Sequence, residues 1–329
     1  MSKPHHSKDQ DMSDIASNTI QEPSGSQPRR YVLMTAAHNE EEMIEGTIKS
    51  IVSQTIPPER WVIVSDNSTD KTDEIVQEYA KRHNFIRYLR IDRKPGRNFG
   101  AKVRALQSGY KLLEDYQYNF IGNVDADVSL EPFYFQQLLG QFGRRPRLGL
   151  AGGFFFEEKN GEFKSRRGNR RYAVTHAAQL VRRECYEAIG GYAVLEYGGE
   201  DWHAETSARM NGWEIEAFPD LKIFHHRHTG EGGGLLRYRF RQGRMDYSFG
   251  SDPQFEMLKC FLRVPDTPFL IGSVARLTGF VWSWVHRDPR LVSEEFVAFL
   301  RNDQRGRLVA LFKIRSGHGW RRGLTLPSK

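Results

Sequence analysis

The residues best suited to chemistry are Asp125 and Asp127, which end the stretch FIGNVDAD (120–127). In an extended segment, side chains two residues apart point the same way, so both carboxylates would face one space. Two such charges repel each other unless a cation joins them, and their hard oxygen atoms suit Mg²⁺ or Mn²⁺. Mg²⁺ is commonly held by one or two carboxylates together with substrate phosphates. The pair therefore predicts a metal–phosphate site; the alternative is that both aspartates simply begin a loop.

Two further stretches carry polar side chains that could bind a ligand. In SDNSTD (65–70), Asp66 could accept a hydrogen bond from a base N–H, whereas Asp70 is better explained as a helix cap. The stretch RNFGAKVRALQSG (97–109) brings Lys102, which could reach a phosphate. The alternative for Lys102 is a place on a solvated basic face of a helix.

Short apolar runs that alternate with helical segments must position these residues. Strands are predicted over 31–37, 61–68, 85–91 and 120–125, and helices over 40–53, 70–82, 98–113 and from 132 onward. Such alternation indicates an α/β fold with a mostly parallel sheet and helices on both faces. Ligands bind beyond the carboxyl ends of the strands in these sheets. That is where AAHNE (36–40), SDNSTD and DAD lie, so one edge of the sheet is expected to collect acidic side chains.

The pattern is looser after residue 150. A strand is predicted over 149–156, helices over 183–189 and 202–211, and strands at EIEAF (214–218) and LKIFHH (221–226). In FHHRHTG, His226 and His228 alternate onto one face and could complete the shell of a cation or bind a diphosphate. His228 is the preferred candidate because it lies nearest the glycine-rich stretch 229–234, which could close over a substrate. The alternative is a polar strand end.

In combination, these motifs resemble glycosyltransferase family 2, the inverting GT-A enzymes that use nucleotide-diphosphate sugars. The resemblance covers about residues 31–229 and rests on the order NEE (39–41), SDNSTD, GAKVRALQSG (100–109), DAD and GGED (198–201). It implies that Asn39 and Glu40 lie at the nucleotide and that Asp66 lies at the base; Lys102 joins this set as a candidate through the phosphate contact considered above. It also implies that Asp125 and Asp127 meet the diphosphate through Mg²⁺ or Mn²⁺.

The same resemblance implies a catalytic base, Asp201, with Glu200 beside it. An inverting transfer needs a base on the acceptor hydroxyl, and general base catalysis is worth about 10²–10⁴ in rate. Asp201 would open a helix, whose dipole lowers the pKa of a carboxyl group; burial or Glu200 could offset that effect. Without the resemblance, a charged first helical turn would explain these two residues equally well.

The stretch RQGRMDYSFG (241–250) is loosely similar to the QxxRW-type motif of the processive members of this family. Arg241 and Arg244 fit its basic positions and are candidates for binding the acceptor or the diphosphate. Met245 stands where the motif has Trp, which argues against processive polymer synthesis.

Composition sets the outer limits of the prediction. The chain has 329 residues and a net charge of +7, and residues 229–329 carry 17 Lys and Arg against 9 Asp and Glu. This excess points to an anionic partner, and since no zinc-finger, helix-turn-helix or RNP motif is found, nucleic acid is not expected. Residues 1–30 are polar, without the apolar core of a signal peptide, and are interpreted as a disordered tail. The two cysteines, Cys185 and Cys260, form no CxxC pair and demand no oxidising compartment.

The last hundred residues predict amphipathic helices. In PFLIGSVARLTGFVWSWV (268–285), small and polar residues fall on one side of a helix and apolar residues on the other, which suits a helix lying in a membrane interface. A second helix, which is expected from Ser293, is apolar at Phe296 and Leu300. The alternative is that both helices pack on each other and on the catalytic domain. The expected domains are a tail (1–30), a GT-A catalytic domain (31–234) and a basic, membrane-associated helical region (235–329).

These observations together predict a cytoplasmic glycosyltransferase that is peripheral on the inner face of the cell membrane. It would transfer a sugar from a UDP- or GDP-sugar to a lipid-linked saccharide in envelope or exopolysaccharide synthesis. One alternative is a polyprenyl-phosphate glycosyltransferase. Another is a non-catalytic sugar-nucleotide-binding protein, against which the intact Asp125, Asp127 and Asp201 argue. A nucleotidyltransferase would need a glycine-rich N-terminal phosphate loop, which the sequence lacks.

Overall fold

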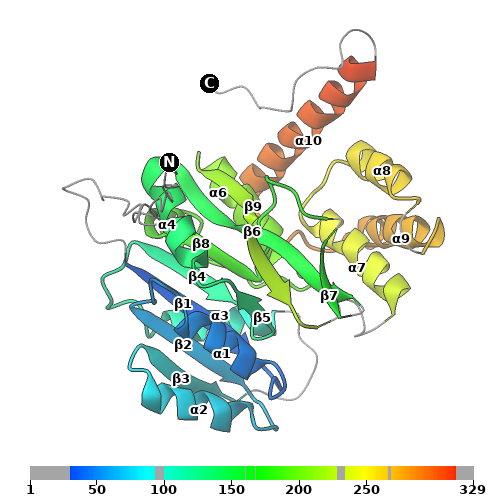
Figure 1. Ribbon diagram of the computed structural model, residues 1–329. Helices are drawn as coiled ribbons and strands as arrows, with labels where there is room; N and C mark the ends of the chain where they lie inside the picture. Colours follow the sequence, from blue (N-terminus) through cyan, green and yellow to red (C-terminus); the bar gives the residue numbers. More distant parts are fainter. Residues whose placement is uncertain are drawn as a thin grey trace, which may run out of the picture.

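The computed structural model describes residues 30–92, 100–159, 161–166, 168–227, 234–265 and 268–315. The tail expected over residues 1–30 falls outside this range except for its last residue. Within the described chain, a nine-stranded sheet runs in the order β3-β2-β1-β4-β8-β6-β9-β5, with β7 paired to β6 (Figure 1).

The first half of the sheet is parallel, as the alternating pattern predicts. Its strands are β1 (Tyr31–Ala37), β2 (Arg60–Asp66), β3 (Ile86–Ile91) and β4 (Phe120–Val124), and they pair in parallel in the order β3-β2-β1-β4. The intervening helices are α1 (Ile44–Val52), α2 (Thr72–Arg82) and α3 (Ala101–Tyr110). The carboxyl ends of β1, β2 and β4 therefore meet at one edge.

The second half of the sheet is mixed, so the expectation of a mostly parallel sheet holds only for the first half. Its strands are β5 (Val128–Leu130), β6 (Leu148–Lys159), β7 (Glu162–Ser165), β8 (Ala178–Arg182) and β9 (Glu214–His225). β8 lies between β4 and β6 and is antiparallel to both, whereas β6 and β9 are parallel. At the side of the sheet, β5 pairs antiparallel with β9, and β7 pairs antiparallel with β6. The two strands predicted over 214–218 and 221–226 are one strand, β9, with a register shift opposite Gly153 and Phe154.

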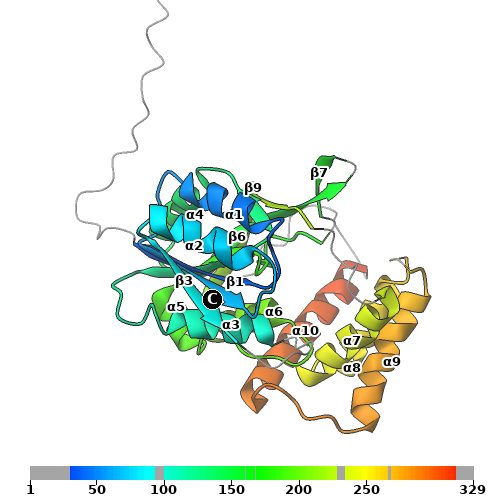
Figure 2. The same cartoon turned by 90° about the horizontal axis from the view of Figure 1, so that it is seen from below.

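Helices cover both faces of the sheet (Figure 2). α1, α2 and α4 (Tyr134–Arg144) pack on one face, where Ile44, Ile48 and Phe135 are completely buried. α3, α5 (Arg183–Ala188) and α6 (Glu200–Met210) cover the other face. Gly109 of α3 lets this helix approach β2, because a Cβ there would lie 3.0 Å from the side chain of Val64. This sandwich holds β1, β2, β4 and α6 rigidly around the sheet edge that carries the acidic residues.

The C-terminal helices form a group beside the sheet (Figures 1 and 2). They are α7 (Leu235–Ser248), α8 (Pro253–Leu262), α9 (Ile271–Val285) and α10 (Glu294–Arg315). α7 and α9 cross at two glycines: a Cβ on Gly243 would lie 1.9 Å from the carbonyl oxygen of Arg276, and one on Gly279 would lie 2.0 Å from that of Phe240. Only glycine permits so close a crossing.

An ionic cluster joins α7, α8 and α9 beneath this crossing. Arg276 of α9 binds Asp246 of α7 and lies 2.8 Å from Glu256 of α8, and all three side chains are buried. Lys259 lies 2.8 Å from Asp246. Breaking a buried pair of this kind leaves an uncompensated charge and costs about 3–5 kcal/mol, so the cluster fixes how the three helices fit together.

α9 turns its small and polar side toward the rest of the protein, whereas an ordinary surface helix buries its apolar side. Its buried residues include the small and polar ones predicted to share one side, Gly272, Ser273, Arg276, Gly279 and Ser283. The apolar residues Ile271, Val274, Trp282 and Trp284 are exposed. In α10, by contrast, Phe296 and Leu300 are buried with Leu195 and Phe249 against the catalytic domain. The expectation that α10 docks on a membrane is therefore wrong for these two residues, because core packing already uses them.

Candidate active site

The DAD segment follows β4 directly, as the sequence predicts. The N–H of Asp125 donates to the carbonyl of Ala177 (2.7 Å), and that of His226 donates to the carbonyl of Asp127 (3.0 Å). These two bonds hold the segment between the start of β8 and the end of β9. Asp125 is about a quarter exposed and Asp127 is mostly buried, so both carboxylates sit at a partly desolvated edge.

Lys102 of α3 reaches Asp125, with its Nζ 2.6 Å from Oδ1. Burial raises the pKa of Asp125, Lys102 opposes that shift, and the neighbouring carboxylates of Asp127 and Glu200 add to it, so that the pKa is about 6. Although burial disfavours the charge on Lys102, Asp125 and Glu200 hold its pKa above the usual value. Lys102 thus belongs to the site and is not a solvated helix residue.

Asp127 is held by two residues from the end of β9. His225 Nε2 lies 3.2 Å from its Oδ2, and Arg227 Nε lies 3.7 Å from the same oxygen. Burial opposes ionisation of Asp127, yet His225 and Arg227 keep its pKa below the usual value. Arg227 also binds Glu40, whose pKa burial raises to about 7. Arg227 therefore bridges the segment after β1 to the segment after β4.

The histidine beside the aspartates is therefore His225, and not His226. His226 Nε2 lies 2.8 Å from Ser129 Oγ, and its ring packs edge-on against Phe163. His228, predicted as a metal ligand, lies outside the described residues. Arg227 was missed by the sequence analysis, although it stands within the same FHHRHTG stretch that drew attention to the histidines.

Asp201 and Glu200 open α6 and belong to the same electrostatic cluster as the DAD segment. Burial raises the pKa of Asp201, the charge of Glu200 raises it further, and the N–H of Trp202 (2.7 Å from Oδ1) and Lys102 oppose the shift. Burial and Glu200 therefore offset the lowering of the Asp201 pKa that is expected from the helix dipole. A group with this raised pKa is better suited to accept a proton near neutral pH.

Glu205, one turn after Asp201, is a second buried acid that the sequence analysis missed. It accepts a hydrogen bond from the N–H of Val174, and burial, followed by the charge of Asp201, raises its pKa to about 8. The spacing of four residues places both acids on one face of the helix. That spacing is the sequence signal by which Glu205 could have been found.

The segments after β1 and β2 are tied to each other. Asn39 adopts the left-handed conformation (φ 55°), and its Oδ1 accepts a hydrogen bond from the N–H of Thr69 (2.8 Å). Asp66 is buried at the end of β2. Asp70 stands one residue before Lys71, the N-cap of α2, and its carboxylate accepts from the N–H of Thr72 (3.0 Å) in the first turn. Asn39 and Asp66 thus lie at the same sheet edge as the acidic cluster, and contact of either residue with a nucleotide stays a prediction.

α7 supports the loop that leads to Asp201. Gly199 has φ 90°, and a Cβ there would lie 2.7 Å from Sδ of Met245, the residue at the Trp position of the QxxRW-type motif. Arg244 binds Asp288 (2.8 Å) and donates to the hydroxyl of Tyr197 (2.7 Å) in the same loop. Arg241 lies over the ring of Tyr238. Arg244 therefore positions the loop in this structure, and contact of either arginine with an acceptor or a diphosphate stays a prediction.

The family model for glycosyl transferase family 2 matches residues 33–197, half of the chain. The chain belongs to glycosyl transferase family 2. Among curated relatives, the chain is 30% identical over 123 residues to poly-beta-1,6-N-acetyl-D-glucosamine synthase of Staphylococcus epidermidis. The matched residues make up 36% of this chain and 27% of that protein. The chain is 39% identical over 85 residues to the probable glycosyltransferase YdaM of Bacillus subtilis, and the match covers 25% of this chain and 20% of that protein. The chain thus spans about a quarter of the length of these relatives.

Solved structures confirm the GT-A fold of this glycosyltransferase. The mannosyltransferase PcManGT from Pyrobaculum calidifontis, in complex with GDP-Man and Mn²⁺, matches with a TM-score of 0.53 and 18% identity, over 88% of this chain and 82% of that one. GalNAc-T7 with UDP, GalNAc and Mn²⁺ matches with a TM-score of 0.52 and 15% identity, over 80% of this chain and 55% of that one. At these identities the likeness shows the fold alone.

The acidic cluster of the glycosyltransferase suits a cation that is shared with a ligand. In the described part of the chain, no three His, Cys, Asp or Glu side chains are grouped to hold a metal ion alone. The two carboxylates of the DAD segment are paired with Lys102, His225 and Arg227, and their mutual repulsion contributes to the raised pKa of Asp125. Two carboxylates that share a cation with substrate phosphates are the usual arrangement for Mg²⁺.

Proposed function

We propose that this glycosyltransferase transfers a sugar, with inversion, from a nucleotide-diphosphate sugar such as a UDP- or GDP-sugar to an acceptor hydroxyl. The observation that carries the proposal is the ion pair between Lys102 of α3 and Asp125 after β4 (2.6 Å), with the carboxylates of Glu200 and Asp201 at the start of α6 close enough to act electrostatically on that pair. A base and a phosphate-binding edge therefore share one site. The GDP-Man bound to PcManGT, the UDP bound to GalNAc-T7 and the Mn²⁺ in both structures support this class of substrate.

In this proposal Asp201 accepts the proton of the acceptor hydroxyl. The freed oxygen then forms a bond to the anomeric carbon while the bond from that carbon to the diphosphate breaks on the opposite face. The electron pair of the broken bond leaves with the nucleoside diphosphate. Lys102 stays charged at the diphosphate side, and Glu200 keeps the pKa of Asp201 raised. Asn39 and Asp66 orient the nucleotide.

Asp125 and Asp127 would hold the Mg²⁺ or Mn²⁺ that the family implies. Bound there, the cation would supply positive charge to the leaving diphosphate. His225 and Arg227 keep Asp127 ionised, so its carboxylate is ready to act as a ligand at neutral pH. In the absence of a cation, Lys102 neutralises Asp125. When a cation binds, Lys102 would be released and could contact a phosphate oxygen.

We further propose a lipid-linked saccharide as the acceptor and a place on the cytoplasmic face of the membrane. The support is the outward apolar side of α9, with Trp282 and Trp284, beside a C-terminal region of strongly positive charge. Within the described residues, no helix combines the length and apolar character needed to cross a bilayer. An exposed apolar face with cationic neighbours suits a helix that lies in the interface.

Asp201→Asn tests the proposed base, because the amide keeps the shape of the side chain but cannot take a proton at neutral pH. With a panel of UDP- and GDP-sugars, we expect donor affinity near that of the wild type and turnover reduced at least about a hundredfold. Glu200→Gln is the matched control and should lose far less. A full loss in Glu200→Gln with none in Asp201→Asn would transfer the role of base to Glu200.

A further inference from the structure

Each carboxylate of the DAD segment has a basic partner from another part of the chain. Nζ of Lys102, on α3, lies 2.6 Å from Oδ1 of Asp125. Nε of Arg227, which follows β9, lies 3.7 Å from Oδ2 of Asp127. The same guanidinium also binds the carboxylate of Glu40 after β1. The protein therefore sets its own positive charges against the two carboxylates that would hold a cation.

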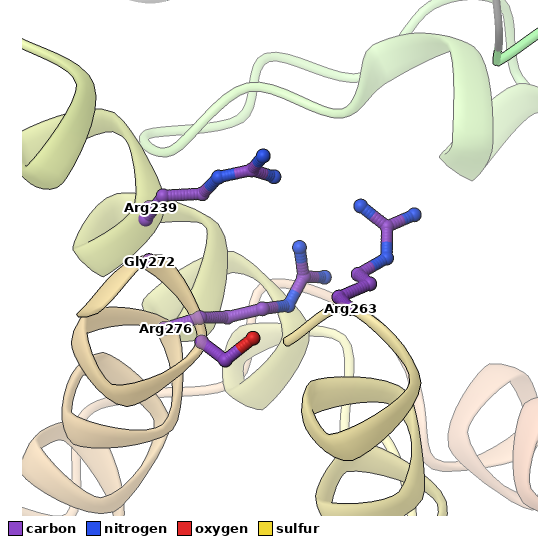
Figure 3. Close-up of a pocket in the computed structure, with 5 residues that line it drawn as sticks. Arg239, Arg263, Gly272 and Arg276 are labelled. Atoms are coloured by element: carbon purple, nitrogen blue, oxygen red, sulfur yellow. The ribbon is translucent and has the colours of Figure 1, made fainter. Parts of the chain in front are cut away.

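These two basic side chains can be reached by a ligand, unlike the arginines among the C-terminal helices. Figure 3 shows Arg239, Arg263 and Arg276 at a gap between α7, α8 and α9 that is too narrow to admit a water molecule. Arg276 is 3% exposed there and is bound to two buried carboxylates, so it serves the packing of the helices. By contrast, the side chains of Lys102 and Arg227 are 29% and 47% exposed.

The charges of a nucleotide-diphosphate sugar and of its cation cancel each other. Each of the two phosphates carries one negative charge, and Mg²⁺ or Mn²⁺ carries two positive charges. A cation that bound alone would have to displace Lys102 and Arg227 and would then be repelled by both. A diphosphate that bound alone would be repelled by Asp125 and Asp127. If the two bind together, every charge at this sheet edge can keep an opposite partner.

We propose that Lys102 and Arg227 exchange partners when the donor and its cation bind together. Asp125 and Asp127 would pass from these basic side chains to the cation, and Lys102 and Arg227 would pass to oxygens of the diphosphate. Arg227 suits this exchange because a planar guanidinium can pair with two phosphate oxygens at once. The inference rests on the donor class proposed above and adds Arg227 as a contact of the diphosphate.

The exchange also makes the cation and the donor bind cooperatively. Whichever of them binds first releases side chains that the other needs. Such coupling is reciprocal, so each ligand strengthens the binding of the other by the same factor, which is typically about 5–150-fold.

The alternative is that Arg227 only ties the segment after β1 to the segment after β4. The two roles predict opposite effects on the binding of a cation alone. If Arg227 competes with the cation for Asp127, its removal should strengthen cation binding. If it only shapes the site, its removal should let the two segments separate and should weaken cation binding.

The test compares Arg227→Gln with Arg166→Gln in the full-length chain. The Arg166 side chain is similarly exposed (42%), and its Cζ lies 5.5 Å from the ring centre of Phe155. That ring in turn lies 4.8 Å from the ring of His225, so Arg166 is near the same sheet edge. In the described structure, its carboxylate partner is Glu157 (3.6 Å). The control therefore removes one positive charge near the site but leaves both pairs of the DAD segment in place.

Binding of Mn²⁺ alone is measured from the EPR signal of free Mn²⁺, and binding of UDP and GDP by calorimetry with and without Mn²⁺. In the wild type, we expect Mn²⁺ to raise the affinity for at least one of the two nucleotides about tenfold or more. In Arg227→Gln, we expect Mn²⁺ alone to bind at least about threefold more tightly, and the nucleotide with Mn²⁺ to bind about tenfold less tightly. Arg166→Gln should change both affinities far less.

Arg227→Lys keeps the proposal testable if Arg227→Gln does not fold. We expect this variant to bind Mn²⁺ alone as the wild type does, because the competing charge is retained. It should recover only part of the nucleotide affinity, because an ammonium group lacks the planar fork of a guanidinium. Full nucleotide affinity in Arg227→Lys would overturn the paired contact with phosphate.

Two further outcomes separate this inference from the function on which it rests. Weaker or unchanged binding of Mn²⁺ alone in Arg227→Gln, or an equal gain in Arg166→Gln, would overturn the exchange of partners and leave the donor class intact. A wild type that binds neither UDP nor GDP in the presence of Mn²⁺ would overturn the donor class itself, and the exchange with it.

Discussion

Gly199→Ala should uncouple α7 from the proposed base. Gly199 has φ 90°, a conformation that costs a residue with a Cβ about 1–2 kcal/mol. The new Cβ would also lie 2.7 Å from Sδ of Met245 and 3.0 Å from the ring of Phe249. Overpacking of this kind typically costs about 1–3 kcal/mol more, and it is relieved by movement of the Met245 and Phe249 side chains or of the loop. Glu200 and Asp201 follow at once in the chain and would move with it.

The expected kinetic effect follows from that displacement. A shift of about 1 Å in a catalytic group costs roughly a hundredfold in rate, so turnover of the donor should fall by about that factor. Donor affinity should stay near the wild-type value, because Asn39, Asp66 and the DAD segment are held by other elements. Turnover is measured by donor consumption, and donor affinity by calorimetry.

Gly198→Ala is the matched control for this prediction. Gly198 has φ 81° and therefore carries a similar backbone cost, but its Cβ would come no closer than 3.9 Å to any neighbour, which is Glu200 Oε2. We expect a much smaller loss of turnover in this variant, and partial recovery in Gly199→Ala/Met245→Ala. Equal losses in Gly198→Ala and Gly199→Ala would refute the idea that contact with α7 positions the base.

Two further predictions concern pH and the membrane. The pKa of Glu205 is about 8 in the folded protein and near the usual value when unfolded, so the folded state binds the extra proton and stability falls as pH rises from about 5 to 8. Glu205→Gln should reduce the slope of the unfolding free energy against pH, measured by urea titration, by up to about 1.4 kcal/mol per pH unit. If the unfolding free energies of the two proteins change in parallel with pH, the burial argument is contradicted. Trp282 and Trp284, 49% and 66% exposed, should supply the part of acidic-vesicle binding that resists salt. Replacing both by Ser should weaken binding in high salt about tenfold, and unfolding of that variant would instead mean that the two rings stabilise the fold.

The first half of the fold was predictable because its signals are local. β1, β2 and β3 are short runs that each have a helix after them, β4 is a short apolar run that leads into β5, and polar residues mark where three of the four strands end. The DAD segment could be placed at this sheet edge on that basis, whereas the Glu200–Asp201 pair was assigned through the family resemblance and Lys102 had a solvated helix face as its alternative. The structure brings them together through α3, β4 and α6.

The parts that were missed depend on contacts between distant segments. β8 is a run of five residues whose place between β4 and β6 is set by antiparallel pairing, and nothing in AQLVR itself specifies that partner. His225 lies beside Asp127 because β9 pairs with β5 in a register that sets His225 opposite Val128, and the sequence alone, which favoured His226, does not specify that register. Arg244 could not be assigned to Tyr197 and Asp288 without the path of the chain through α9.

The crossing of α7 and α9 implies a sequence signature for relatives that share this helical group. Gly243 stands three residues before Asp246, and Arg276 stands three residues before Gly279, so each helix offers one glycine to the partner's backbone and one charge to the partner's side chain. The contacts at both glycines are with carbonyl oxygens, which cannot rotate away as a side chain can. A homologue with G-x-x-D and R-x-x-G about thirty residues apart should therefore keep the whole helical group. One that matches only the catalytic half should have lost both glycines together.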